Sequence, residues 1–360
     1  MRFAFFGSSL VSSYWNGACT YYRGMIRNLH ERGHEVTFHE PIAYERQQHR
    51  DIEDPGYARV VIYPAETEDQ VLAAVERARG EADVVVKTSG VGVHDHLLEA
   101  AVLDLDAPVT IFWDVDAPAT LAEMEGDPGH PLLARIAEFD LVLTYGGGDP
   151  VVSRYDAVGA RECIPLYNAL DPATHHPVPA EPALRSDLAF LGNRLPDREA
   201  RVEEFFFRSV DLLPKRSFLL GGSGWEGHHP ADNLRYLGHV STRDHNALNC
   251  TPLSVLNVSR ESMAANGFSP APRVFEAAGA GACLITDSWE GLDLFLEPGT
   301  EVLAAGDGAE VAELLDGLDP ARAAAIGEAA RRRVLAEHTY AHRAEQVEAI
   351  LEGRSVRSAA

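Results

Sequence analysis

The sequence predicts an α/β protein of two doubly wound, Rossmann-like domains that face each other across a cleft. The chain has 360 residues, enough for two domains of ordinary size. Short apolar runs alternate with helical segments, which is the pattern of parallel α/β sheets. The alternation stops in a proline-bearing stretch around residues 165–182, which indicates a linker, and then resumes. Ligands of such folds bind at the carboxyl ends of the strands.

In the first half, strands are expected where apolar and β-branched residues cluster, and helices where apolar residues recur at helical spacing. The first strand is followed by a loop and a helix, and a Gly-His turn leads into the second strand. The expected elements, in order, are strand Phe3–Phe6, helix Tyr21–Arg32, a strand up to Phe38, strand Val60–Tyr63, helix Asp69–Arg79, strand Asp83–Lys87, helix His96–Ala101, strand Val109–Trp113, strand Asp140–Thr144 and helix Val151–Tyr155.

The second half repeats this alternation and ends in three helices. We place the first domain at residues 1–170, the second at 171–340, and a final helix with a tail at 341–360. The expected elements are strand Leu188–Leu191, helix Asp197–Phe207, strands Ser217–Leu220 and Val255–Asn257, helix Pro272–Ala278, strand Cys283–Thr286, and helices Ala309–Gly317, Pro320–His338 and Ala341–Leu351.

Composition excludes several classes of function. The net charge of −24 argues against nonspecific binding to nucleic acid, whose phosphates require a basic surface. No apolar run reaches the roughly 20 residues of a membrane helix, and no secretion signal is visible, so we expect a cytoplasmic protein. The four cysteines are scattered without a CxxC pair, so neither a zinc site nor a disulfide framework is indicated.

A literal GxGxxG string, Gly222–Gly227, follows an expected strand. A dinucleotide site would need a helix to start there, so that its N-terminus meets the pyrophosphate. The residues that follow, from His228 to Asn233, indicate a loop instead. We therefore expect no NAD at this position.

The segment Leu256–Asp293 carries the strongest candidate for an anion site. Ser269 and Pro270 suit the start of a helix, whose free N–H groups attract anions, and Gly267 allows close approach to the backbone. Arg273 can contact a diphosphate, and Glu276, on the same helix face, can accept both hydroxyls of a ribose. The alternative is an ordinary surface Arg–Glu pair.

A loop rich in glycine and hydroxyl groups follows the first strand, and such a loop can wrap a phosphate or a sugar. It can equally be a plain polar turn. Its candidate ligand-binding residues are Ser12, Ser13, Asn16, Gly17 and Arg23.

Asp114 and Asp116 lie at the end of the strand Val109–Trp113, where reactive groups of parallel sheets project. Either carboxylate is a candidate general base, and either can instead cap the next helix. His94, in the run His94-Asp95-His96, is a second candidate base. The same run suggests a metal only weakly because a third ligand is missing, so no metal is expected.

The chain resembles the CgeB-like (spore maturation protein) family of glycosyltransferases. The resemblance spans nearly the whole chain and is carried by residues 12–24, 112–120, 188–200, 256–282 and 288–293, with PLYNALDPATHHP (165–177) similar to a GT-B interdomain connection. It implies a GT-B fold without bound metal, a donor nucleotide on the second half and an acceptor mainly on the first. The closing helix would cross back onto the first domain.

The resemblance also implies roles for single residues. Glu276 matches the ribose-binding glutamate of a two-glutamate motif, and Ser269 and Arg273 match diphosphate contacts, to which Arg260 is added. The other glutamate of the motif is replaced here by Phe268, which leaves a retaining or an inverting outcome open. Asp114 matches a position near the reacting carbon.

The expected function is metal-independent transfer of a sugar from a nucleotide-sugar, with UDP as the first choice of nucleotide, to a hydroxyl acceptor. The nucleotide-sugar serves as co-substrate, and no cofactor is expected. Two alternatives stay open: a nucleotide-sugar-binding protein without turnover, which the loss of a glutamate at Phe268 suggests, and a sugar-nucleotide epimerase. No nucleic acid or membrane partner is expected, and the chain would be a monomer or a homodimer.

Overall fold

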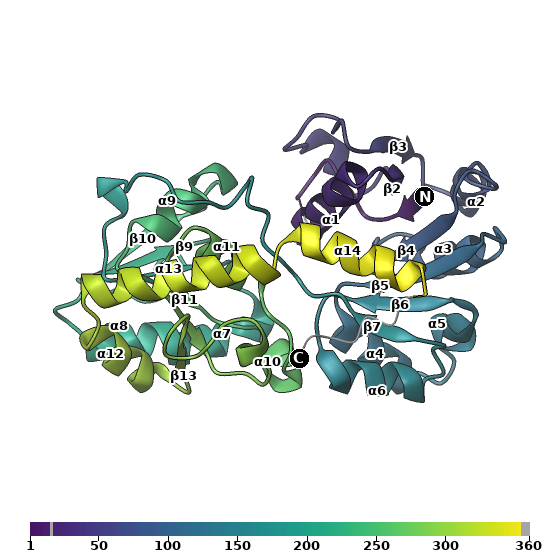
Figure 1. Ribbon diagram of the computed structural model, residues 1–360. Helices are drawn as coiled ribbons and strands as arrows, with labels where there is room; N and C mark the ends of the chain where they lie inside the picture. The colour runs from purple at the N-terminus through teal and green to yellow at the C-terminus, as the bar shows by residue number, and fades with distance from the viewer. Residues whose placement is uncertain (15–16, 354–360) are drawn as a thin grey trace. The chain divides into compact units, whose positions relative to one another are not determined.

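The computed structural model describes residues 1–14 and 17–353, and it divides the chain into two compact units. Unit 1 comprises Met1–Tyr167 together with the segment that begins at Tyr340, and unit 2 comprises Asn168–Thr339. Each unit holds one parallel sheet with helices on both faces (Figure 1). Both halves are therefore doubly wound, Rossmann-like domains, as the alternating pattern predicted.

The sheet of unit 1 has seven parallel strands in the order β3-β2-β1-β4-β5-β6-β7. Its strand sequences are apolar on both faces because helices cover both. The strands are β1 (Arg2–Phe6), β2 (Glu35–Pro41), β3 (Arg59–Tyr63), β4 (Val84–Thr88), β5 (Val109–Asp114), β6 (Leu141–Thr144) and β7 (Cys163–Pro165).

Alternate residues of β1 pack into different layers. Ala4 and Phe6 belong to the large core beneath the helices that follow β3 to β6, while the ring of Phe5 contacts Tyr22 on the opposite face. The helices are α1 (Cys19–Glu31), α2 (Glu68–Glu76), α3 (Asp95–Leu103), α4 (Ala117–Gly126), α5 (Pro131–Arg135), α6 (Gly148–Ala157) and α14 (Tyr340–Leu351).

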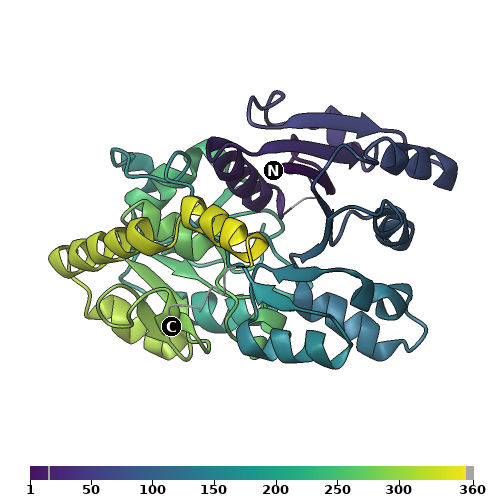
Figure 2. The same cartoon turned by 45° about the vertical axis from the view of Figure 1, so that its right-hand side comes forward.

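The C-terminal helix α14 lies alongside α1 within unit 1, as both views show (Figures 1 and 2). The lack of a side chain at Gly24 allows the two helices to approach closely, because a Cβ at that position would lie 2.3 Å from the ring of Tyr340. At the other end of the contact, Arg32 donates to Glu348 and Glu345. Residues separated by most of the chain thus complete one domain.

Unit 2 has a six-stranded parallel sheet in the order β10-β9-β8-β11-β12-β13. The strands are β8 (Leu188–Leu191), β9 (Phe218–Gly221), β10 (Leu234–Gly238), β11 (Ser254–Asn257), β12 (Leu284–Asp287) and β13 (Leu303–Ala305). The helices α9 (His245–Cys250), α11 (Pro272–Gly279) and α13 (Pro320–Glu337) lie on one face, and α7 (Pro196–Val202), α8 (Arg208–Leu212) and α12 (Gly308–Asp316) on the other (Figure 1). A short helix, α10 (Glu261–Asn266), precedes α11.

The helix expected at Asp197–Phe207 is longer and irregular. A π-helical turn, Glu203–Phe207, joins α7 to α8, and it directs three consecutive phenylalanines into the core. The GxGxxG string is followed by a loop, as expected. Its first glycine, Gly222, is needed for packing, since a Cβ there would lie 2.2 Å from the carbonyl oxygen of Gly192.

Candidate functional site

The loop before α11 differs from the sequence prediction. The helix starts at Pro272, and Ala271 is its N-cap, so Ser269 is not the cap. Ala271 precedes a proline and is therefore forced into the extended conformation, with φ −65° and ψ 151°. The Ser269 hydroxyl is buried and donates to the Gly267 carbonyl at 2.9 Å. No side chain of the described residues caps α11, so its first turn is open to an anion.

Gly267 and Phe268 both have positive φ, 71° and 47°. This conformation is costly for a bulky residue such as Phe268. The ring fits because Gly291 lies against it, where a Cβ would be 2.2 Å from Cδ1 of Phe268. The backbone here is therefore held in a strained form directly before α11.

Arg273 lies in the first turn of α11 and is partly buried. Its Nη1 lies 3.4 Å from Oε2 of Glu276 and 3.4 Å from Oδ1 of Asn249 on α9. Within the described part of the chain, Nε of Arg273 and Nδ2 of Asn249 are buried without a hydrogen-bond partner. Buried donors are normally paired, so these two groups indicate a place for a ligand acceptor.

Arg198 lies near Arg273, and a third arginine, Arg260, lies near Arg198. Arg198 on α7 donates from Nη2 to the carbonyl of Asn193 at 2.7 Å, and its buried Nε has no partner among the described residues. Burial lowers the pKa of Arg198, and Arg273 and Arg260 lower it further, while Asp197 opposes them. Arg260 forms an ion pair with Asp197. Three guanidinium groups thus gather in a chain of net charge −24, which favours an anion there.

The sequence analysis did not single out Arg198. It lies in LAFLGNRLPDREA (188–200), a segment that carried the family resemblance but received no residue role. Gly192 lets Arg198 pack closely, because a Cβ there would lie 2.8 Å from Nη2 of Arg198. In the sequence, the glycine that precedes the arginine by six residues was the feature that could have pointed to Arg198.

Glu276 lies between Arg273 and two histidines. Its Oε1 is 3.9 Å from Nε2 of His175, which comes from the stretch after β7, and His245 at the start of α9 lies close by. Burial raises the pKa of Glu276, but the charges of Arg273, His175 and His245 outweigh it, and the net pKa is lowered. Glu276 is therefore a carboxylate in a partly closed, polar site, which suits the acceptance of hydroxyl donors.

A buried network of one ion pair and several hydrogen bonds holds the loop that follows β11. Asp287, at the end of β12, is fully buried and receives Nη2 of Arg201 at 2.7 Å. Its other oxygen accepts the N–H and the hydroxyl of Ser259, both at 3.1 Å. Arg260 is the next residue, so this network fixes the position of one of the three arginines.

In unit 1, Asp114 at the end of β5 has no exposed surface. One of its oxygens accepts the Tyr155 hydroxyl at 2.6 Å and the other the N–H of Asp116 at 2.9 Å. Burial raises the pKa of Asp114, and these hydrogen bonds oppose it only in part. Asp114 is predicted to lie near the reacting carbon, and that role stays a prediction. In the structure it accepts the N–H of Asp116, which is half-buried.

His94 is the N-cap of α3, has a positive φ of 52°, and is half-buried. Its neighbours are already engaged: Asp95 receives the buried Lys87 ammonium at 2.8 Å, and His96 contacts Glu99 at 3.1 Å. A cation at Asp95 would therefore have to displace Lys87. His94 stays a candidate base.

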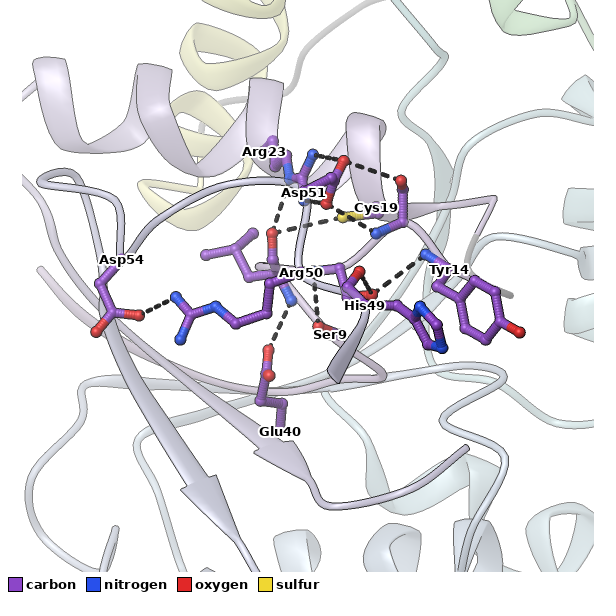
Figure 3. Close-up of polar contacts among 12 residues, drawn as sticks. Ser9, Tyr14, Cys19, Arg23, Glu40, His49, Arg50, Asp51 and Asp54 are labelled. Carbon is purple, nitrogen blue, oxygen red and sulfur yellow. Dashed lines mark hydrogen bonds and ion pairs between the residues drawn. The ribbon is translucent and has the colours of Figure 1, made fainter. Parts of the chain in front are cut away.

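The loop after β1 is held by hydrogen bonds and an ion pair with the segment that follows β2 (Figure 3). Arg23 donates from Nη1 and Nη2 to both oxygens of Asp51, at 2.9 and 2.7 Å, and from Nε to the Leu10 carbonyl. Ser13 also binds Asp51, and the Ser12 hydroxyl donates to the His49 carbonyl at 2.8 Å. Arg23 and the two serines thus help to hold the loop, and their contact with a ligand stays a prediction. Gly17 is exposed, and Asn16 lies outside the described residues.

The structure thus brings Arg273 and Glu276 together in unit 2 with His175 and His245, and it places Arg198 near both Arg273 and Arg260. Gly267 and Ser269 form the loop that leads to them. In unit 1, Asp114 and Asp116 meet at the end of β5, whereas Ser12, Ser13 and Arg23 form a separate cluster after β1. In the described part of the chain, no helix is long and apolar enough to span a membrane.

Residues 198–349 match a family model described as glycosyl transferase-like. Solved structures with similar folds include the sucrose-phosphate synthase of Thermosynechococcus elongatus (TM-score 0.72, 13% identity, 98% of each chain covered). Anabaena HepE in complex with UDP-glucose gives a TM-score of 0.65 at 13% identity, covering 98% of this chain and 100% of that one. T4 phage BGT in complex with UDP-glucose gives 0.62 at 12% identity, covering 99% and 100%. The comparison with curated protein sequences found no match.

These likenesses and the two parallel sheets define the fold as GT-B. The match over residues 198–349 makes that part of the chain similar to a glycosyl transferase-like family.

Proposed function

We propose that the protein transfers a hexosyl group from a UDP-sugar to a hydroxyl acceptor without a metal ion, as a CgeB-like enzyme of the cytoplasm. The observation that carries the proposal is the position of Arg273, which lies near both the ionised Glu276 and Arg198, with Arg260 also close to Arg198. Planar guanidinium groups suit a diphosphate, and a carboxylate suits the two hydroxyls of a ribose.

In the reaction, the bond between the anomeric carbon and the diphosphate oxygen breaks, and a bond to the acceptor oxygen forms. Negative charge grows on the departing UDP, and the three arginines and the start of α11 would stabilise it. The acceptor hydroxyl gives its proton to a base on unit 1. Asp116, positioned by Asp114, and His94 are the candidates for that base.

The UDP preference rests on Anabaena HepE and T4 phage BGT, whose structures hold UDP-glucose. A protein that binds the nucleotide-sugar without turnover is the second candidate. The observation that favours it is Phe268, held in a strained conformation where related transferases carry a glutamate.

The test combines binding and turnover. UDP and UDP-glucose should raise the melting temperature of the wild type, because they bind only the folded state. Arg273→Ala should lower kcat by about 10²- to 10³-fold, as expected for loss of a group that stabilises charge in the transition state. Lys215→Ala in the same unit is the control and should leave both properties unchanged. Wild-type turnover in Arg273→Ala would refute the diphosphate role, and UDP binding without UDP release across donors and acceptors would favour the second candidate.

A further inference from the structure

The two histidines beside Glu276 are not explained by the proposed transfer reaction. The three side chains come from separate segments. His175 lies in the stretch after β7, His245 in α9 and Glu276 in α11. One ligating atom from each side chain lies within 4.8 Å of the other two. Two imidazoles and one carboxylate are the ligand set that Zn²⁺ uses in many enzymes.

The three side chains are partly buried and together offer two nitrogen ligands and one oxygen ligand. The set of nitrogen and oxygen ligands favours Zn²⁺, Ni²⁺ or Co²⁺ over Mg²⁺, which prefers oxygen.

Arg273 is the main obstacle, because its positive charge lies close to Glu276. The carboxylate, however, presents its two oxygens to different partners. Oε2 faces Arg273 at 3.4 Å, and Oε1 faces His175 at 3.9 Å. An ion bound by Oε1 and the histidines would leave the contact with Arg273 in place. Metal–ligand bonds of about 2.0–2.1 Å require the ligating atoms to approach to roughly 3.3 Å, a movement that partly exposed side chains can make.

We propose that His175, His245 and Glu276 form a binding site for a divalent transition-metal ion, with Zn²⁺ as the best fit, and that this ion competes with the nucleotide for Glu276. The first part stands on the ligand cluster alone, and the second part rests on the proposed function. The metal is then an inhibitor of donor binding, in an enzyme whose transfer step needs no metal.

A second cluster in unit 2, formed by Glu199, Glu203 and His228, provides a matched control. There Glu199 is already paired with Arg194 at 2.5 Å, and His228 contacts Glu203. Removal of His228 deletes a histidine of comparable exposure without touching the proposed site.

The experiment titrates ZnCl₂ into chelator-treated protein by calorimetry and repeats the titration with CoCl₂ by visible absorption. Mg²⁺ serves as a negative control. His175→Ala and His245→Ala should each weaken Zn²⁺ binding at least tenfold, while His228→Ala should retain the wild-type affinity at the site. Circular dichroism and the melting temperature without metal establish that each variant is folded, and His175→Gln and His245→Asn replace any that is not.

UDP affinity is measured in the same variants with and without Zn²⁺. We expect Zn²⁺ to weaken UDP binding in the wild type and in His228→Ala, but not in His175→Ala or His245→Ala. Equal Zn²⁺ affinity in the wild type and the two site variants, or Mg²⁺ binding as tight as Zn²⁺, would overturn the metal site. Zn²⁺ binding that depends on both histidines but leaves UDP affinity unchanged would overturn the competition. Absence of UDP binding to the wild type would count against the proposed function and would leave the metal result standing.

Discussion

The buried ion pair between Asp287 and Arg201 allows a test of how the loop after β11, which carries Ser259 and Arg260, is held. Asp287 has no exposed surface and accepts Arg201 at 2.7 Å. Asp287→Asn removes the charge and leaves Arg201, about a fifth exposed, with only the exposed Glu261 carboxylate at 3.3 Å as a counter-ion. Breaking one partner of such a pair costs about 3–5 kcal/mol. The Asn side chain also presents an NH₂ group where Asp287 accepts donors from Ser259 or Arg201.

That cost should appear as a lower melting temperature of unit 2. For a domain of this size, each kcal/mol lowers the midpoint by roughly 2–4 °C, so the expected fall is roughly 6–20 °C. Differential scanning calorimetry is the suitable assay, because the two units can unfold in separate transitions. Ser259→Ala is the matched control. It removes one hydrogen bond to the same carboxylate and should cost only about 1 kcal/mol.

UDP affinity provides a second measurement on the same proteins. Ser259 precedes Arg260, so a loosened loop should also weaken nucleotide binding in Asp287→Asn. If Asp287→Asn melted within 2 °C of Ser259→Ala, at roughly the cost of one hydrogen bond, the ion pair would not be holding the loop and the reasoning would be refuted.

Two further predictions concern unit 1. The raised pKa of the buried Asp114 means that its contribution to stability is complete below the unfolded-state pKa and is lost as pH rises through the folded-state value. Asp114→Asn cannot ionise, so its melting temperature relative to the wild type should increase between about pH 4 and pH 7; parallel pH curves would contradict this. Gly24→Ala improves helix propensity by about 1 kcal/mol but should still destabilise, because its Cβ would lie 2.3 Å from the Tyr340 ring. Thermal melts of Gly24→Ala and of the exposed control Gly56→Ala test this, and a higher melting temperature for Gly24→Ala would show that the ring moves aside at little cost.

The elements with long apolar patterns were predicted well. The strand expected at Phe3–Phe6 is β1 (Arg2–Phe6), and the helix expected at Pro320–His338 is α13 (Pro320–Glu337). Elements with weak patterns were missed. β10 (Leu234–Gly238) is a half-buried edge strand with a bulge, and α9 and α10 have only six residues each, too few for a helical period to be visible.

The candidate site of unit 2 was predicted in part for the same reason. Arg273 and Glu276 are three residues apart on one helix, so their proximity follows from local geometry and is confirmed at 3.4 Å. The false helix start at Ser269 was avoidable, since Ala271 stands before a second proline and cannot be helical. Arg198, His175 and His245 reach the site from other segments, and only the tertiary fold reveals that convergence.

The local arrangement of charged side chains in unit 2 is more informative about a ligand site than the composition of the chain. The net charge of −24 is an average over the chain, and it does not reveal that Arg198 lies close to both Arg273 and Arg260. Arg198 and Arg273 each keep a buried Nε without a partner among the described residues, while Arg201 is neutralised by Asp287 and Arg260 is paired with Asp197. Unpaired buried donors are unfavourable in a folded protein, so these two Nε atoms support the proposed anion site. In that proposal Arg198 and Arg273 contact the diphosphate directly, and Arg260, which follows the Ser259–Asp287 contact, adds its charge.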